Sequence, residues 1–294
     1  MYDNQEFEKE IAQIDLNAPV PQDEHGRELY YIKRLREIVA ARSEEAGRPL
    51  TACTVTFGCQ MNARDSEKLS GTLAKAGFVL TDKEEADFVI FNTCTVRDNA
   101  DQRTFGHLGR ISHLKKKNPR MKVAVCGCMM QEKGNVDRIQ KSYSFVDLVF
   151  GTHNIYRFAQ YLYEIYDEDR KVTQIWDKAE SIVESQPTQR KYAYKSGINI
   201  MFGCDNFCSY CIVPYVRGRE RSREPREIIR EVEMLARDGV KEVMLLGQNV
   251  NSYGRGLENP VTFAQLLKET AGVDGIRRVR FMTPHPKDLS EDLI

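Results

Sequence analysis

Apolar and polar positions alternate along this chain in blocks that predict helices and strands in turn. Within the charged segment 1–50, four apolar residues recur every three positions, near helical spacing. They predict one amphipathic helix there: Leu29, Ile32, Leu35 and Ile38. The run 50–57 that follows is rich in β-branched residues and is bounded by Gly58, which predicts a strand.

The same alternation continues to about residue 165. The pattern predicts strands at 87–92, 122–126 and 148–151, and helices at about 63–76, 98–117, 134–141 and 154–165. Strands that alternate with helices are typical of a parallel sheet covered on both faces. We therefore expect an α/β domain of Rossmann-like architecture over 51–165, preceded by a helical N-terminal extension over 1–50.

A second block of strands and helices begins near Lys195. Residues 166–195 lose periodicity and gain charge, which predicts an inter-domain linker. Strands are then expected at 198–202, 242–246 and 278–282, helices at about 225–238 and 262–271, and a further helix at the end of the chain. These are about two and a half β/α units, whereas a closed eight-fold barrel takes about 250 residues. We expect residues 196–294 to form the first part of such a barrel, an incomplete domain.

Composition adds little about partners but directs the interpretation of the cysteines. Lys plus Arg equals Asp plus Glu at 43 each, so net charge provides no general attraction to nucleic acid. The first ten residues lack the basic start and apolar core of a signal peptide, and no apolar run reaches the ~18 residues of a membrane helix. We expect a cytoplasmic protein without a membrane segment, in which thiols stay reduced and serve metal or redox chemistry.

Three cysteines, Cys204, Cys208 and Cys211, lie close together in a polar loop after an apolar run. A structural zinc site usually has four protein ligands. An iron-sulfur cubane held by only three cysteines either recruits a distant fourth or leaves one iron open to another ligand. Burial of the cysteines as small apolar residues does not explain why they cluster among Gly, Asp, Asn and Ser. The spacing therefore predicts a metal cluster.

A second set of cysteines follows three of the predicted strands. Cys59, Cys94 and Cys128 are roughly 35 residues apart, about one β/α unit, so successive crossovers would bring them to the same edge of the sheet. Cys53 and Cys126 lie inside strand runs and are expected in the core. Because Cys126 is only two positions before Cys128, an exchange of their roles as ligand stays open.

These motifs resemble a known family. The Cys204, Cys208, Cys211 loop with Tyr210 before its last cysteine resembles the radical S-adenosylmethionine signature. With Cys59, Cys94 and Cys128 in a preceding α/β domain, the chain resembles the radical S-adenosylmethionine methylthiotransferase family from about residue 51 to 294. Five further segments resemble its tRNA-modifying branch: 92–97, 151–154, 214–218, 247–253 and 285–289.

The resemblance implies an enzyme that adds a methylthio group to the C2 carbon of N(6)-isopentenyl adenosine next to the tRNA anticodon. It implies two 4Fe-4S clusters and S-adenosyl-L-methionine. The loop cluster would cleave this cofactor to a radical, and the cluster at Cys59, Cys94 and Cys128 would carry the sulfur. A reducing protein such as a flavodoxin would supply electrons to a monomeric enzyme.

The resemblance also implies roles outside the clusters. Tyr210 would line the adenine of the cofactor, and Gln248 and Asn249 would bind its amino-acid end. Arg217 and Arg219, in an Arg-rich run, would contact substrate or cofactor. Two alternatives stay open: a sister methylthiotransferase acting on a ribosomal protein or another tRNA adenosine, and a non-catalytic iron-sulfur or zinc protein.

Overall fold

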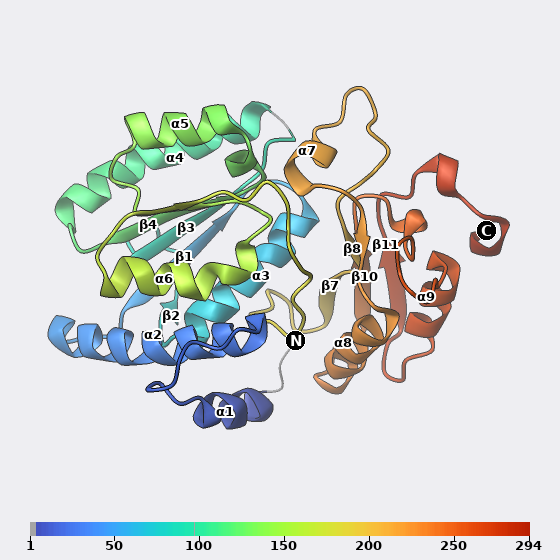
Figure 1. The fold of residues 1–294 in the computed structure, drawn as a ribbon, viewed down its shortest axis with the longest axis horizontal. Coiled ribbons are helices and arrows are strands. Elements are labelled where there is room, and N and C mark those ends of the chain that lie inside the picture. The colour runs from blue at the N-terminus through green and yellow to red at the C-terminus, as the bar shows by residue number, and fades with distance from the viewer. Residues whose placement is uncertain (1–3, 97) are drawn as a thin grey trace. The chain divides into compact units, whose positions relative to one another are not determined.

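The computed structural model describes residues 4–96 and 98–294, and the side chains of 98–101 are not described. Arg97, which ends one of the family-like segments, therefore lies outside the described residues. The chain divides into two units, one that ends at Gln189 and one that begins at Arg190 (Figure 1). Each unit is described by itself below.

A six-stranded sheet forms the centre of the first unit, and its neighbouring strands are all parallel. The strand order is β2-β1-β3-β4-β5-β6, so the chain leaves β1 toward one edge and returns to continue on its other side. The point between β1 and β3 is thus the topological switch point, where open α/β sheets bind ligands. The strands are β1 Thr51–Thr56, β2 Val79–Leu80, β3 Phe88–Thr93, β4 Lys122–Gly127, β5 Leu148–Phe150 and β6 Val172–Gln174.

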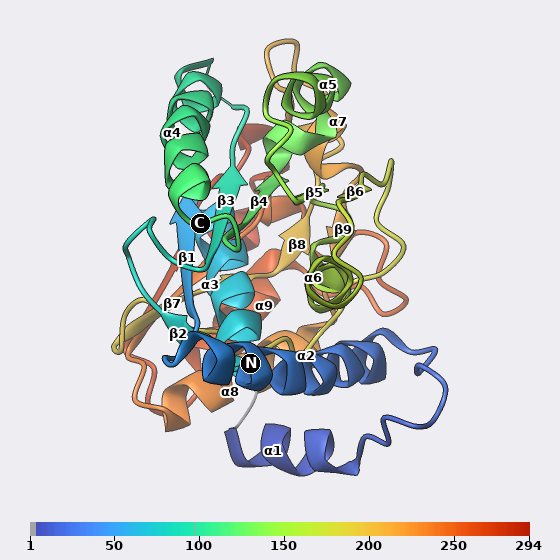
Figure 2. The same cartoon turned by 90° about the vertical axis from the view of Figure 1, so that its left-hand side faces the viewer.

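Helices cover both faces of this sheet because strand side chains alternate between two cores. Val89 and Phe91 pack with α4 and α5, whereas Phe88 and Ile90 pack with α2, α3 and α6 (Figure 1). Figure 2 shows α1 beside α2, where Phe7 joins the second of these cores. The helices are α1 Asn4–Gln13, α2 Glu24–Ala46, α3 Gln60–Lys75, α4 Asp98–Lys117, α5 Lys133–Ser142 and α6 Phe158–Asp167.

Three expectations for this unit need correction. Residues 1–50 contain two helices, α1 and α2. The additional helix forms because the polar segment before Leu29 includes two apolar residues, Phe7 and Ile11, that are buried against the core. The helix expected from 154 begins with a 3-10 turn, Ile155–Arg157, and is α-helical only from Phe158. The aperiodic stretch after 165 includes β6, which is too short to show a pattern and is held by its pairing with β5.

The second unit is built on a three-stranded parallel sheet in the order β11-β10-β7, with α8 and α9 in its two crossovers. Sequential parallel strands joined by helices are the start of a (β/α) barrel, as expected. The strands are β7 Lys195–Asn199, β10 Glu242–Leu246 and β11 Arg278–Phe281, and the helices are α7 Val213–Arg217, α8 Pro225–Arg237 and α9 Phe263–Ala271.

Two details of this unit differ from the pattern. The strand expected at 198–202 is split: after β7 the chain turns to form β8 Met201–Phe202, which pairs antiparallel with β9 Arg221–Ser222. In place of the final helix, the chain forms two 3-10 turns, Pro286–Asp288 and Glu291–Leu293. A further 3-10 turn, Val250–Ser252, follows β10.

Candidate metal centres

The three N-terminal cysteines all lie at the carboxyl edge of the first sheet. Cys59 is the N-cap residue of α3 and directly follows the β1 exit, Cys94 follows β3, and Cys128 begins a 3-10 turn after β4. Cys59 is exposed, whereas Cys94 and Cys128 are buried. The topology therefore places one thiol beside each side of the switch point and a third on the next strand.

Asn62, in the first turn of α3, connects the loops that carry these cysteines. Its Nδ2 donates hydrogen bonds to the backbone oxygens of Phe57, 3.0 Å away, and Thr93, 2.7 Å away. Its Oδ1 lies 3.7 Å from Sγ of Cys59 and 3.8 Å from Sγ of Cys128. The two sulfur atoms are therefore no farther apart than the sum of these two distances.

Gly58 brings Cys94 to the same place. It has a φ of +104°, which an L side chain rarely adopts, and a Cβ there would overlap Cβ of Cys94 and lie 2.6 Å from its Sγ. Only glycine lets Cys94 pack directly against the residue that precedes Cys59. All three thiols thus gather at one edge of the sheet.

The other two cysteines of this unit belong to the cores. Burial raises the pKa of the Cys53 thiol to about 11, so this side chain is a neutral and unreactive thiol near pH 7. Cys126 is fully buried and packs in the core with residues of α2, α3 and α6. Cys128 lies two residues later, beyond the end of β4, and its Sγ contacts Asn62. The geometry therefore favours Cys128 over Cys126 as a ligand.

The second group of cysteines lies in the loop between β8 and α7. Gly203 begins the loop with a φ of +76°, and a Cβ there would overlap the backbone oxygens of Gly218 and Arg219. The backbone N–H of Cys204 donates to the Gly218 oxygen at 3.2 Å, and that of Cys211 donates to the Cys208 oxygen at 2.9 Å. The first bond joins the start of the loop to Gly218, directly after α7, and the second closes a turn between Cys208 and Cys211.

The thiols of this loop differ in their environment. Burial raises the pKa of the Cys204 thiol, although a hydrogen bond from the backbone of Asn206 partly offsets this effect. Cys208 and Cys211 are partly exposed. Nε2 of His285, from the segment after β11, lies 3.9 Å from Sγ of Cys208. The loop thus presents two accessible thiols and one buried thiol.

The aromatic and arginine residues near this loop fall into different surroundings. Tyr210 is 90 % exposed, so its ring is open to a ligand. Arg219 is also exposed; its guanidinium lies over the ring of Phe207 and forms a 2.8 Å ion pair with Asp205. Arg217, by contrast, is buried. Of the two arginines, Arg219 is therefore the one available to a partner.

Gln248 and Asn249 follow the carboxyl end of β10 in the second unit. Oε1 of Gln248 is buried and has no hydrogen-bond partner among the described residues. Asn249 is 1 % exposed, and both polar atoms of its amide are paired: Nδ2 donates to Asp288 at 2.7 Å and Oδ1 accepts from the backbone N–H of His285 at 3.2 Å. The structure thus leaves Gln248 an open acceptor and uses Asn249 to hold the segment after β11.

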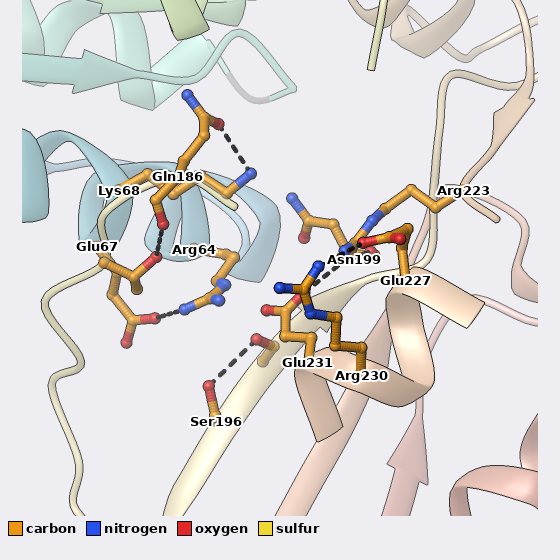
Figure 3. A network of polar contacts seen from close by, with 12 residues as sticks. Arg64, Glu67, Lys68, Gln186, Ser196, Asn199, Arg223, Glu227, Arg230 and Glu231 are labelled. Atoms are coloured by element: carbon orange, nitrogen blue, oxygen red, sulfur yellow. Dashed lines mark hydrogen bonds and ion pairs between the residues drawn. The ribbon is translucent and has the colours of Figure 1, made fainter. Parts of the chain in front are cut away.

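Other members of the Arg-rich run form ion pairs within the second unit (Figure 3). Arg223 is buried, pairs with Glu231 at 2.9 Å and donates to the backbone oxygen of Asn199 at 2.6 Å. Arg230 pairs with Glu227 at 4.0 Å. In the first unit, the same figure shows the pairing of Arg64 with Glu67 on α3. Arg223 therefore has a structural partner in the core of the unit.

Both cysteine groups consist of the ligand type that iron-sulfur clusters prefer. In the described part of the chain, no three His, Cys, Asp or Glu side chains converge as ligands of one metal ion. A four-iron cluster contacts each cysteine through a different iron, so its ligands stand farther apart. All eight cysteines are outside disulfides, and thiolates are the preferred ligands of such clusters. Each group supplies three thiols, one fewer than the four cysteines that usually hold such a cluster.

Sequence reasoning did not single out two residues that now stand beside the cysteines. Asn62 is three positions after Cys59, a spacing that returns a side chain to the start of its helix, and this signal was available. His285 is 77 positions from Cys208, and nothing local connects the two. Its approach depends on the parallel pairing of β10 and β11.

Comparisons with known proteins agree with these two units. Residues 51–151 match the model of Uncharacterized protein family UPF0004, and residues 198–293 match that of the Radical SAM superfamily. A tRNA-2-methylthio-N(6)-dimethylallyladenosine synthase of Lachnoclostridium phytofermentans is 60% identical over 86% of this chain and 55% of its own length. One from Acetivibrio thermocellus is 49% identical over 95% of this chain and 58% of its own. The chain spans about half the length of these curated relatives.

A solved structure shares the fold. The radical S-adenosylmethionine methyltransferase TsrM from Kitasatospora setae, solved with cobalamin and a [4Fe-4S] cluster, aligns with a TM-score of 0.52 and 16% identity. The alignment covers 83% of this chain and 57% of that one.

In the described ranges, no helix is long and apolar enough to cross a membrane.

Proposed function

We propose that this chain is a tRNA methylthiotransferase, because residues 198–293 match the Radical SAM superfamily and residues 51–151 match family UPF0004. The proposed reaction adds a methylthio group to the C2 carbon of N(6)-isopentenyl adenosine next to the anticodon. The relatives' names support this reading over an enzyme that modifies a ribosomal protein.

The observation that carries the proposal is the presence of two separate cysteine groups, one at the carboxyl edge of the six-stranded sheet and one in the loop between β8 and α7. Cys204, Cys208 and Cys211 would hold a 4Fe-4S cluster that, when reduced, supplies the electron that cleaves S-adenosyl-L-methionine to a carbon radical. Cys59, Cys94 and Cys128 would hold a second 4Fe-4S cluster for the sulfur. A non-catalytic protein would not require an open iron in either group.

The chain's own residues would position the cofactor. Oε1 of Gln248, a buried acceptor, suits the cofactor's ammonium group, because pairing would remove the cost of an unsatisfied buried oxygen. The exposed ring of Tyr210 suits stacking on adenine. Asn249, whose amide is already paired, would act by fixing the segment from His285 to Asp288.

The partners follow from this chemistry. The substrate would be tRNA, with Arg219 as the exposed cation beside the cluster loop. A reducing protein such as a flavodoxin would deliver electrons to a monomer in the cytoplasm.

The test separates the two groups of cysteines. The reconstituted chain is incubated anaerobically with dithionite, S-adenosyl-L-methionine and tRNA that lacks the methylthio group, and products are measured by mass spectrometry. Replacing Cys204, Cys208 and Cys211 by Ala is expected to abolish 5′-deoxyadenosine formation. Replacing Cys59, Cys94 and Cys128 is expected to leave this cleavage and stop methylthio transfer. Unchanged cleavage in the first variant would refute the assignment.

A further inference from the structure

His285 lies beside a predicted cluster ligand in the second unit. It follows β11, whose carboxyl end lies at the same edge of the sheet as that of β10. Its Nε2 is 3.9 Å from Sγ of Cys208. A ring nitrogen at this position contacts the sulfur directly, and the tautomer of the ring decides which of the two atoms donates.

The other ring nitrogen fixes the tautomer. Nδ1 of His285 accepts a hydrogen bond from the backbone N–H of Lys287 at 3.2 Å. A backbone N–H only donates, so Nδ1 carries no proton, and in a neutral imidazole the proton is then on Nε2. His285 therefore directs an N–H donor, not a lone pair, at the sulfur of Cys208.

The position of the ring is fixed by the chain around it. Asn251 accepts from the His285 N–H at 2.8 Å and donates to its backbone oxygen at 2.7 Å, and Asn249 accepts from the same N–H at 3.2 Å. Pro286 restricts the residue before it to extended backbone, and His285 has φ −88° and ψ 131°. The loop after β10 thus holds this residue in one place.

A second contact ties the same turn to the cluster loop. Nζ of Lys287 donates to Oδ1 of Asn206 at 2.8 Å, and Asn206 lies two residues before Cys208. The turn from His285 to Lys287 therefore meets the loop at two points. A surface turn that only connected β11 to the end of the chain would need neither.

We propose that His285 is a positioning residue that donates an N–H···S hydrogen bond to the Cys208 thiolate and raises the reduction potential of the cluster on that loop. This inference rests on the proposed function in one respect, that Cys208 holds a cluster. Hydrogen bonds to cluster sulfurs help set the reduction potential. A donor stabilises the more negatively charged reduced state, so its removal makes reduction harder.

Two amide variants separate the donor from the fold. The side-chain nitrogen of Gln reaches the position of Nε2, whereas that of Asn reaches only the position of Nδ1. His285→Gln therefore keeps the donor and His285→Asn removes it. His113→Asn, at an exposed position of α4, is the matched control.

The measurement is an anaerobic redox titration followed by electron paramagnetic resonance. The full chain carries Cys59→Ala, Cys94→Ala and Cys128→Ala, so that only the loop cluster gives a signal. We expect His285→Asn to shift the midpoint to more negative potential, and His285→Gln and His113→Asn to keep the parent's midpoint. Loss of iron from the Asn variant alone would also support a donor role for His285, because the Asn and Gln variants differ in how far the side-chain nitrogen extends toward Cys208.

Equal midpoints in the Asn variant and the parent would overturn the inference and leave the proposed function standing. Loss of iron from both the Asn and Gln variants would also overturn it, because the effect would then be on folding. A parent that binds no iron on the loop would instead refute the proposed function.

Discussion

Nδ2 of Asn62 lies 2.7 Å from the backbone oxygen of Thr93, and this hydrogen bond joins the first turn of α3 to the exit of β3. Together with the bond to Phe57, it closes the gap between the loops of Cys59 and Cys94. The first group of cysteines is therefore held by an uncharged side chain that is itself fully buried.

Replacing Asn62 by Ala should weaken both the fold and the site. Two backbone oxygens would lose a donor, and each unsatisfied buried group costs about 1–3 kcal/mol. Urea unfolding should show a loss of about 2–5 kcal/mol in the free energy of unfolding, with less iron retained by the chain. Asn17→Ala, at an exposed position, serves as the control. Equal stability of the two variants would contradict this role of Asn62.

Gly203→Ala should disrupt the loop of Cys204, because a Cβ would overlap the backbone oxygens of Gly218 and Arg219. Gly256→Ala is a close control: its φ of +80° is similar to the +76° of Gly203, but a Cβ there meets nothing within 4 Å. Both changes carry about 1–2 kcal/mol of left-handed strain. Only Gly203→Ala should also lower the iron bound by the loop after reconstitution. The idea fails if both variants bind iron equally.

Glu28, on α2, should make the stability of the protein depend on pH. Burial raises its pKa to about 8, although Lys68 and hydrogen bonds from Gln186 and Thr72 oppose this effect. The folded protein holds this proton between its ordinary pKa of 4.5 and about 8, where the unfolded chain releases it. The free energy of unfolding should therefore fall as pH rises through this window, by up to about 1.4 kcal/mol per pH unit.

Glu28→Gln should remove this dependence and raise stability at pH 8. Urea unfolding at pH 5, 6.5 and 8 measures it. Glu44→Gln, at an exposed position on the same helix, should keep the slope of the parent. A slope in Glu28→Gln as steep as the parent's would show that another group titrates.

Arg219→Gln should weaken binding of tRNA and reduce its dependence on salt, with a loss of about one unit in the slope of log K against log salt. Its exposed guanidinium lies over the ring of Phe207 and pairs with Asp205 at the surface, and such an exposed ion pair contributes little to stability. Arg230→Gln is the control, since Arg230 is also exposed and paired with an acid, Glu227. Filter binding at several salt concentrations compares them. Identical slopes for both variants would exclude Arg219 as an RNA contact.

The alternation of apolar and polar blocks predicted the α/β class because the two larger sheets are parallel and the central strands of the first, β3 and β4, are buried. β3, for example, has six buried residues in a row, and such a run predicts a strand from the sequence alone, without knowledge of the strands it pairs with. β2 and β6, with two and three residues, show no such pattern, because they are defined by pairing with their neighbours. The spacing of the cysteines predicted that they form two groups. The contact of His285 with Cys208 could not be predicted in this way, because it arises only from tertiary structure.

The central claim is that the two groups of cysteines hold two separate clusters, and metal analysis tests it most directly. Iron and sulfide are measured per chain after anaerobic reconstitution, in the parent and in each triple Cys→Ala variant. We predict about eight iron atoms in the parent and about four in either variant, with matching sulfide. Stoichiometric zinc without iron, or loss of all iron from either variant, would contradict the account.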